Sequence, residues 1–395
     1  MSLFDSLVLL PPDPIFGISA TYRADKREKK IDLVVGSFRT EEGETPVLQA
    51  VKRAEQQLLH KERDKEYLPI DGEETFISEI AELLFGDRLM KEHLYGAQTV
   101  GGTGALRTIA DILFKKWTEV IYTPNLTWPN HRGIFTRVGY KVENYPYYDT
   151  QSHSFDFDNF YDFIEKLPNR SLIVLHASCH NPTGADLKPE EWRKLSELFL
   201  IKGHFPFFDC AYQGFGKSLI DDVYSVRLFA EAGHEMAVAY SCAKNFSLYG
   251  ERVGALYFLV RSKTNAETIR SYAKALIRTN YSNPPMHGAK IVAEILSSSN
   301  LTELWEEELS VMRARIAHMR KSLLNALQAK SKKMDFSFLN EQLGLFSFFS
   351  LEKSQVERLI SEFGIYMPYD GRINVTGLNE KNLDPVVKAL LKVIE

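Results

Sequence analysis

The stretch YSCAKNFSLYGERVG, residues 240–254, decides how the rest of this chain is interpreted. It lies between two apolar runs, residues 236–239 and 255–260, which predict two buried strands joined by a polar loop. The loop carries Lys244, and a second cation, Arg252, follows eight positions later. Most lysines are exposed, but burial and a neighbouring cation lower the pKa of an amine and make it a better nucleophile. Such an amine could form a Schiff base with a carbonyl-bearing cofactor.

The composition is that of a globular protein with a sizeable core. The chain has 395 residues, of which 44% are apolar, and this length suits two domains or one large α/β core with a smaller unit. A formal net charge of -4 gives no reason to expect nucleic acid or an anionic membrane as a partner. We therefore expect neither of these partners.

Cysteine usage and segment composition predict a cytoplasmic location. Cys179, Cys210 and Cys242 are an odd number of cysteines in apolar surroundings, which fits a reducing compartment better than a disulfide framework. No apolar run reaches the roughly 18 residues that a membrane helix needs. The start of the chain is acidic where a signal peptide would be basic, and it lacks the arginines of a transit peptide.

A glycine-rich segment, QTVGGTGALR at residues 98–107, predicts a strand that runs directly into a helix. Glycines let the backbone approach a ligand closely, and the free N–H groups at a helix start favour an anion. Gly102 and Thr103 are therefore candidates for phosphate binding. The segment is neither the dinucleotide fingerprint nor a Walker loop, because no lysine follows the glycines, and alone it is a weak signal.

A tryptophan follows the next predicted strand, residues 120–123. Trp128 lies between two prolines, a position from which its flat face could meet a ligand ring. The alternative is that Trp128 packs in the core of its own domain, as most tryptophans do.

The segment HASCHNPTG, residues 176–184, invites a zinc interpretation through His176, Cys179 and His180. An extended chain would separate the two histidines by about 13 Å, at roughly 3.3 Å per residue, which is too far for one metal ion. We therefore expect no metal site, and interpret Asn181 as the amide of a tight turn after a strand.

An acidic residue ends the strand predicted at residues 205–209. Asp209 lies at the carboxyl edge, where open α/β sheets bind their ligands, and Tyr212 follows three positions later. A turn or cap aspartate is the alternative. The strands alternate with helical segments, which is the pattern of a mostly parallel sheet.

The C-terminal part predicts a long helix, residues 302–330, and then a small α+β unit whose last strand opens with Gly371 and Arg372. Arg278 ends an earlier helix and is either an exposed helix end or a carboxylate clamp. Residues 7–14 are apolar, end in prolines and cannot form a helix. They either lie on another subunit as an arm or pack on their own domain.

Together these loops carry groups that each have one natural task around pyridoxal 5'-phosphate. Lys244 would bind the cofactor covalently, and Asp209 would keep the ring nitrogen protonated so that the ring accepts electrons. Trp128 would stack on the ring, while Asn181 and Tyr212 would hydrogen-bond its oxygen. The phosphate would be bound by residues from three loops: Gly102, Thr103, Ser241 and Arg252.

At this point the sequence resembles the class I aspartate aminotransferases of fold type I, over essentially the whole chain. The matching segments are residues 101–107, 128–131, 179–184, 209–215, 241–254, 278–285 and 371–372. The resemblance implies a large cofactor-binding domain, residues 45–311, with a mostly parallel seven-stranded sheet between helices. It also implies a smaller α+β domain, residues 13–44 and 312–395, and an N-terminal arm, residues 1–12, that clasps a second subunit.

The resemblance also assigns residues to the substrate. Arg372 would hold the α-carboxylate as a bidentate guanidinium, and Arg278 would cross a dimer interface to hold the distal carboxylate. Tyr67 would reach the phosphate of the neighbouring subunit. Further residues would line the substrate or support the cofactor: Gly36, Trp128, Asn181, Phe346 and, behind Asp209, His131.

The implied reaction moves the amino group of L-aspartate to 2-oxoglutarate, giving oxaloacetate and L-glutamate in two half-reactions. Lys244 would transfer the proton as base and acid, with Asp209 and Tyr212 as the other catalytic groups. An aromatic-amino-acid aminotransferase is the nearest alternative. A carbon–sulfur lyase suits Arg278 less, a ligand-sensing regulator would need a basic DNA-binding segment, and a nicotinamide dehydrogenase would need the absent fingerprint.

Five residues depart from the family pattern and bear on the substrate range. Ala243 precedes the lysine where many relatives carry serine, so one hydrogen bond of the site is expected to be missing. Phe38 and Thr40 replace residues that are usually tyrosine and aspartate, and Tyr369 and Asp370 replace a common Ala-Ser pair.

Overall fold

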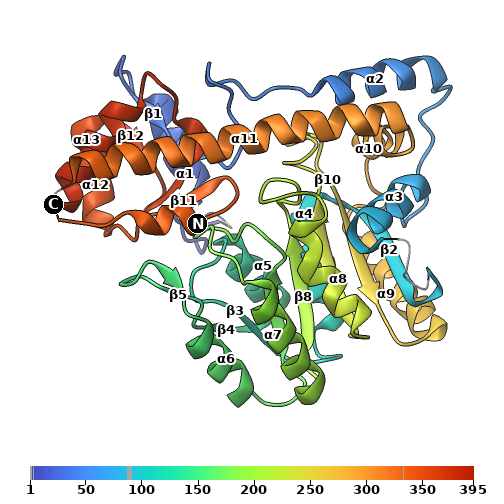
Figure 1. Ribbon diagram of the computed structural model, residues 1–395. Helices are drawn as coiled ribbons and strands as arrows, with labels where there is room; N and C mark the ends of the chain where they lie inside the picture. The colour runs from blue at the N-terminus through green and yellow to red at the C-terminus, as the bar shows by residue number, and fades with distance from the viewer. Residues whose placement is uncertain (1, 3, 87–90, 332) are drawn as a thin grey trace.

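The computed structural model describes residues 2, 4–86, 91–331 and 333–395. Figure 1 shows a large lobe around a central sheet and a smaller lobe that contains the C-terminus. The long helix α11 (Ser299–Lys330) runs along both lobes and connects them, as the sequence predicted for residues 302–330.

The large lobe is organised around a seven-stranded sheet with the order β2-β10-β9-β8-β7-β3-β4. Its strands are β2 (Leu94–Val100), β3 (Val120–Pro124), β4 (Lys141–Tyr145), β7 (Leu172–His176), β8 (Phe205–Cys210), β9 (Met236–Ser241) and β10 (Val253–Leu259). Only β10 runs antiparallel to its neighbours, β2 and β9, and the remaining pairs are parallel. The predicted mostly parallel sheet is confirmed.

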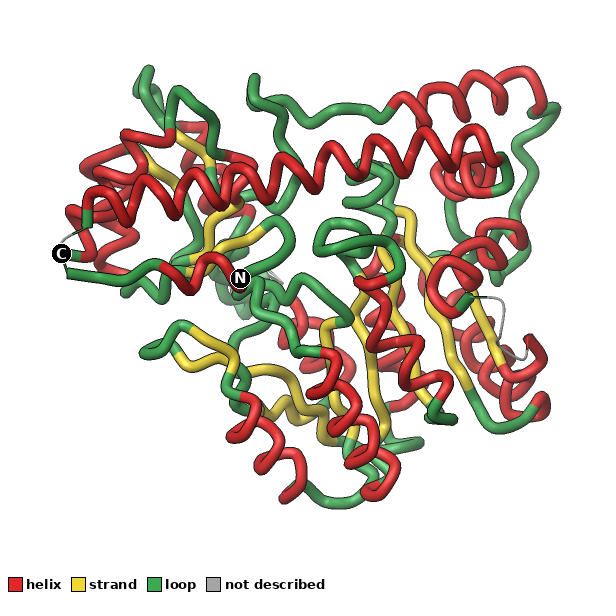
Figure 2. The backbone as a smooth tube through the Cα atoms, viewed as in Figure 1, coloured by secondary structure: helices red, strands yellow, loops and turns green. Residues whose placement is uncertain are grey.

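Helices cover both faces of this sheet, which explains why its central strands are nearly continuous apolar runs (Figure 2). Along β8, Phe207 packs into one core and Phe208 into the other, because successive side chains point to opposite faces. One core includes α4 (Gly101–Leu113), α5 (Asn130–Val138) and α9 (Lys263–Asn280). The other includes α3 (Glu74–Phe85), α6 (Phe157–Lys166), α7 (Pro189–Lys202) and α8 (Tyr224–Glu231).

Two helix starts show where capping groups come from. Helix α3 begins at Glu74, where the carboxylate of Glu73 accepts the backbone N–H of Phe76. Thr45 followed by Pro46 predicts a helix capped by Thr45 that runs to about residue 61. Helix α2 (Gln49–Lys61) ends there but begins after Leu48, so the predicted Thr45 cap is wrong. The carboxylate of Glu308, on α11, instead accepts the N–H groups of Gln49 and Ala50. This tertiary cap cannot be seen in the local sequence.

The small lobe joins the two ends of the chain. Strand β1 (Ile31–Asp32) pairs in parallel with β12 (Ile365–Tyr366), and β11 (Phe346–Phe348) pairs with β13 (Arg372–Asn374) in antiparallel fashion. Helices α1 (Phe16–Ala24), α12 (Lys353–Phe363) and α13 (Leu383–Ile394) complete it, and α1 was not predicted.

The remaining described elements of the whole chain are η1 (Lys91–His93), β5 (Tyr148–Asp149), β6 (Ser154–Phe155), η2 (Asp221–Val223), α10 (His287–Leu296), η3 (Ser337–Glu341) and η4 (Val375–Gly377).

The apolar segment at residues 7–14 contains neither helix nor strand and lies open to solvent. Leu7 is 71% exposed and Leu9 is 96% exposed. Within the described part of the chain, we find no helix long and apolar enough to cross a membrane.

Candidate active site

The predicted site residues follow strands whose carboxyl ends meet at one edge of the sheet. Strand β7 ends at His176, β8 carries Asp209 near its end, and β9 ends at Ser241, just before the loop with Lys244. Parallel strands place these ends side by side, so residues far apart in the sequence converge there.

Lys244 is a partly buried amine in an aromatic and cationic environment. Its Nζ atom lies 4.9 Å from the centre of the Tyr212 ring. Burial lowers the pKa of Lys244 to about 8; Asp209 opposes this shift, while Arg252 and Arg372 add to it. The predicted lowering of the Lys244 pKa is therefore present, and at neutral pH a larger fraction of this amine is uncharged than for an exposed lysine.

Asp209 is held as a buried anion by a chain of hydrogen bonds. Its Oδ2 lies 2.9 Å from Nε2 of His131, whose Nδ1 lies 2.8 Å from the hydroxyl of Thr127. That hydroxyl also lies 3.0 Å from Nε2 of His176. Burial raises the pKa of Asp209, but the bond with His131 and the nearby positive charges outweigh it and lower the pKa overall. An anion at this depth suits a protonated ring nitrogen.

The glycine segment, Ser241 and Arg252 form one tight cradle at the N-terminus of α4. Gly101 has a φ of 66°, and a Cβ atom there would lie 2.6 Å from Nη2 of Arg252. A Cβ atom at Gly102 would lie 3.0 Å from Cβ of Ser241. Thr103 follows in the first turn of the helix, and the guanidinium of Arg252 is exposed. The cradle offers free N–H groups, a hydroxyl and a cation, which suits a phosphate.

Arg372 links the small lobe to the turn that carries Asn181. Its Nη1 donates to Oδ1 of Asn181 at 3.0 Å, its Nη2 donates to the carbonyl of Val34 at 2.9 Å, and Nδ2 of Asn181 donates to the Tyr212 hydroxyl at 3.3 Å. Nε of Arg372 is buried and has no partner among the described residues. A buried cation with an unused donor is costly alone, so the site suits an anionic ligand.

Two further predicted residues lie against this cluster. The Arg372 guanidinium lies 4.1 Å from the centre of the Phe346 ring. A Cβ atom at Gly36 would lie 2.7 Å from Cζ of Phe346, so any larger residue would displace that ring. Trp128 is half-buried and meets His131 edge to face, with ring centres 5.5 Å apart.

Tyr67 and Arg278 stay outside the cluster. Tyr67 is 83% exposed, and Arg278 is exposed at the end of α9, where it donates to the hydroxyl of Ser282. In the described part of the chain, no hydrogen bond or ion pair connects either residue to Lys244 or Arg372. One chain therefore assembles all the predicted site residues except these two.

The sequence reasoning missed some members of the site and misjudged one distance. Thr127, which joins His131 to His176, was not singled out, although its position four residues before His131 was a usable signal. The rings of His176 and His180 lie 4.3 Å apart, so the separation of about 13 Å expected for an extended chain is wrong. The chain turns at Cys179, which has a φ of 52°. The described residues nevertheless contain no group of His, Cys, Asp and Glu suited to a metal ion.

These observations define the class of protein. A lysine with a lowered pKa, a buried carboxylate for a ring nitrogen, an amide and a phenol for a ring oxygen, and a phosphate cradle fit pyridoxal 5'-phosphate. The unpartnered Arg372 Nε adds a place for a carboxylate beside it. The site is that of a pyridoxal-phosphate-dependent enzyme of fold type I.

The comparison with known proteins narrows this class to a family. Residues 28–390 match the family described as aminotransferase class I and II, and the chain belongs to it. It is 44% identical over 398 residues to the aspartate aminotransferase of Pseudomonas aeruginosa, with 100% of both chains covered. It is also 44% identical to the aspartate aminotransferase of Escherichia coli, covering 99% of this chain and 100% of that one.

Solved structures agree with the fold and the cofactor. An aromatic-amino-acid aminotransferase from Burkholderia pseudomallei, covalently bound to pyridoxal phosphate, is 43% identical with a TM-score of 0.95 and 100% of both chains covered. The cytoplasmic aspartate aminotransferase of Saccharomyces cerevisiae is 36% identical with a TM-score of 0.96, covering 99% of this chain and 98% of that one. The predicted family, fold type and cofactor are confirmed, and the chain is a pyridoxal-phosphate-dependent aminotransferase.

Proposed function

We propose that this enzyme transfers the amino group of L-aspartate to 2-oxoglutarate. The observation that carries an amino-acid substrate is the buried Arg372 guanidinium, which lies beside the lysine cluster and keeps one donor unused for an α-carboxylate. The named function of the relatives at 44% identity supports aspartate as the amino donor. The aromatic alternative is supported by the Burkholderia enzyme at 43% identity.

The cofactor, when bound, supplies a carbonyl that joins to amines and a ring that accepts electrons. Lys244 would hold it covalently until the amino group of the substrate takes its place. The released, neutral Nζ of Lys244 would then take the proton from Cα of the substrate, since its pKa is lowered to about 8. Asp209 would keep the ring nitrogen protonated, because its own pKa is lowered and His131 fixes its position.

The remaining cofactor contacts would come from loops around the ring. Asn181 and Tyr212, which already share a hydrogen bond, would donate to the ring oxygen. Trp128 would cover one face of the ring. The phosphate would be held by residues of the cradle and one from a second subunit: Gly102, Thr103, Ser241, Arg252 and Tyr67.

The substrate would be oriented by two arginines. Arg372 would bind the α-carboxylate with Nε and one Nη, because a planar guanidinium matches a carboxylate in a bidentate way. Arg278 would bind the distal carboxylate, with Gly36, Trp128 and Asn181 bounding the space between. Holding both ends of a dicarboxylic substrate fixes Cα near Lys244 and excludes water from that atom.

In the same proposal the enzyme is a cytoplasmic homodimer with shared active sites. Support comes from the exposed Tyr67 and Arg278, which one chain leaves unused, and from the apolar, exposed residues 7–14. Residues 1–12 would be an arm on the partner, residues 13–44 and 312–395 a small domain, and residues 45–311 a large domain. The pairing of β1 with β12 is consistent with that division.

The test compares amino donors. The purified enzyme should be yellow, should bleach when L-aspartate is added, and should show a higher kcat/KM for L-aspartate than for L-phenylalanine, each with 2-oxoglutarate. A higher value for L-phenylalanine would replace the proposal with the aromatic alternative. Pyruvate and thiol release from cystathionine would identify a lyase instead.

A further inference from the structure

A buried glutamine connects the segments that carry Tyr67 and Arg278. Gln98 lies in edge strand β2 and is 0% exposed. Its backbone N–H donates to the carbonyl of Asp71 at 2.8 Å, which joins the strand to the turn after Tyr67. Three residues later the same strand enters the phosphate cradle at Gly101. Gln98 therefore lies between the cradle and the exposed turn.

The side chain of Gln98 uses both ends of its amide. Its Oε1 accepts the N–H of Glu73 at 3.0 Å, and its Nε2 donates to the carbonyl of Pro285 at 2.6 Å. Glu73 follows the turn that begins with Tyr67, and Pro285 ends the loop that follows Arg278. One amide thus holds the two segments at a fixed distance from each other.

Other contacts make this joint rigid. Nδ2 of Asn283 donates to the carbonyl of Leu68 at 2.9 Å, so the loop and the turn also meet directly. Gly72 has a φ of 102°, and a Cβ atom there would lie 2.3 Å from Cβ of Gln98. The turn therefore requires glycine at this point, both for its backbone conformation and for the close approach.

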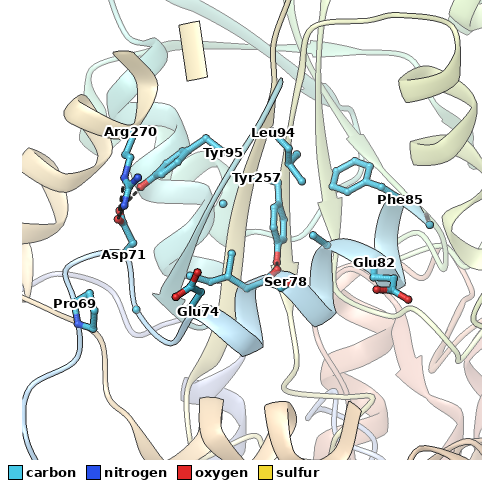
Figure 3. A pocket seen from close by; sticks show the side chains of 15 residues that line it. Pro69, Asp71, Glu74, Ser78, Glu82, Phe85, Leu94, Tyr95, Tyr257 and Arg270 are labelled. Atoms are coloured by element: carbon cyan, nitrogen blue, oxygen red, sulfur yellow. Dashed lines mark hydrogen bonds and ion pairs between the residues drawn. The ribbon is translucent and has the colours of Figure 1, made fainter. Parts of the chain in front are cut away.

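The turn is fixed from its other side by helix α9, which carries Arg278 in its last turn. Figure 3 shows Asp71 facing Arg270 and Tyr95 beside a cavity of about 620 Å³. Oδ2 of Asp71 accepts from Nη2 of Arg270 at 2.9 Å, and Oδ1 accepts from the Tyr95 hydroxyl at 2.8 Å. The same helix thus anchors the turn through Arg270 and presents Arg278 two turns later, at roughly 3.6 residues per turn.

From these contacts we infer that Gln98 is a positioning residue, which fixes where Arg278 and Tyr67 stand relative to each other and so sets the preference for dicarboxylic substrates. The inference rests on the proposed function, in which both residues act in the partner's site. A glutamine is required because the position needs one acceptor and one donor at once. Glutamate would keep the acceptor for Glu73 but place a second acceptor against the Pro285 carbonyl.

The test uses Gln98→Glu and Gln98→Asn, since the shorter asparagine stays neutral but cannot reach both partners. We expect kcat/KM for L-aspartate to fall roughly 10- to 100-fold, because a misplaced binding group about 1 Å away can cost that much. The value for L-phenylalanine should change less than about threefold, since it has no distal carboxylate for Arg278 to bind. Analytical ultracentrifugation checks that the oligomeric state is unchanged.

Hydrogen–deuterium exchange on the cofactor-free protein gives a readout that does not depend on activity. In Gln98→Asn, faster exchange should be confined to peptides covering residues 67–73 and 278–283. Gln342→Glu is the matched control, because Gln342 is a buried glutamine of the small lobe whose amide both donates to and accepts from the backbone of Phe348. This control should leave the ratio between the two substrates and the exchange of both peptides unchanged.

The outcomes separate the inference from the proposed function. Suppose that Arg278→Ala selectively lowers kcat/KM for L-aspartate. If the Gln98 variants then lower kcat/KM equally for both substrates, or for neither, the inferred role of Gln98 is wrong. If Arg278→Ala leaves that value unchanged, the proposed dicarboxylate site is wrong, and the inference falls with it.

Discussion

The buried Lys244 cluster and the exposed Tyr67–Arg278 surface are two halves of one proposed site, built in opposite ways. In the first, charged side chains are removed from water and act on one another electrostatically, so the pKa values of Lys244, Asp209 and Arg372 are all shifted. In the second, Tyr67 and Arg278 remain exposed. The side chains that fix the backbone near them, the amide of Gln98 and the carboxylate of Asp71, are buried. In the proposed dimer, the groups that catalyse the reaction are thus arranged within one chain, and the groups that select the substrate act in the site of the partner.

The largest effect is expected from removing Lys244 from the buried half of the proposed site. Lys244→Ala removes the only amine placed at the cluster by the described residues, and turnover should fall about 10²- to 10⁴-fold, as for loss of a general base. Stopped-flow absorbance with L-aspartate and steady-state assays with 2-oxoglutarate measure this loss. Lys263→Ala, an exposed lysine at the start of α9, is the control and should keep wild-type turnover.

Activity retained in Lys244→Ala would contradict the assignment of the base. Added methylamine offers a further check, because a small free amine can partly replace a missing amine base. Rescue should increase with pH, since only the neutral amine accepts a proton.

The next effect compares the two arginines directly. Arg372→Leu should lower kcat/KM for both L-aspartate and L-phenylalanine by about 100-fold, because losing charge-assisted hydrogen bonds to a carboxylate costs about 3 kcal/mol. Arg278→Leu should produce a similar loss for L-aspartate and less than about threefold for L-phenylalanine. Steady-state kinetics with both donors give the four values.

The opposite result for the two arginine variants would contradict the assignment of the α-carboxylate to the buried half and of the distal carboxylate to the exposed half. If Arg372→Leu discriminated between the donors and Arg278→Leu did not, the buried guanidinium would bind the distal carboxylate. Thermal unfolding of both variants provides the control for folding. Replacing a buried cation by a well-packed apolar residue is often tolerated or stabilising, so Arg372→Leu is expected to remain folded.

The buried half of the site was largely predictable from the sequence, because its residues are marked by short local patterns. Polar residues at the ends of apolar strands, such as Asp209 and Lys244, must converge at one sheet edge. The exposed half was predictable only through the family resemblance, because nothing local shows that Arg278 is more than a helix end. Contacts between distant segments were not predictable either, which explains the missed cap of α2 by Glu308 and the role now inferred for Gln98.

The smallest expected effect is a shift in titration that reports on the charges around Lys244. In the cofactor-free protein only the neutral amine reacts with an acylating reagent, so the rate of Lys244 modification should rise with pH and level off above about 8. In the urea-unfolded protein the rate should continue to rise towards about pH 10.4. Peptide mass spectrometry after timed modification measures both profiles, and equal midpoints would contradict the burial of this amine.

Two variants should move that midpoint in opposite directions and so identify its causes. Asp209 raises the pKa of Lys244 against the effect of burial, so Asp209→Asn should shift the midpoint to lower pH. Arg372 lowers the pKa, so Arg372→Leu should shift the midpoint to higher pH. Shifts of the same sign would mean that solvent access, rather than the charges of the cluster, controls the amine. Lys263→Ala should leave the midpoint unchanged, because Lys263 is exposed at the start of α9 and is not among the charges that act on Lys244.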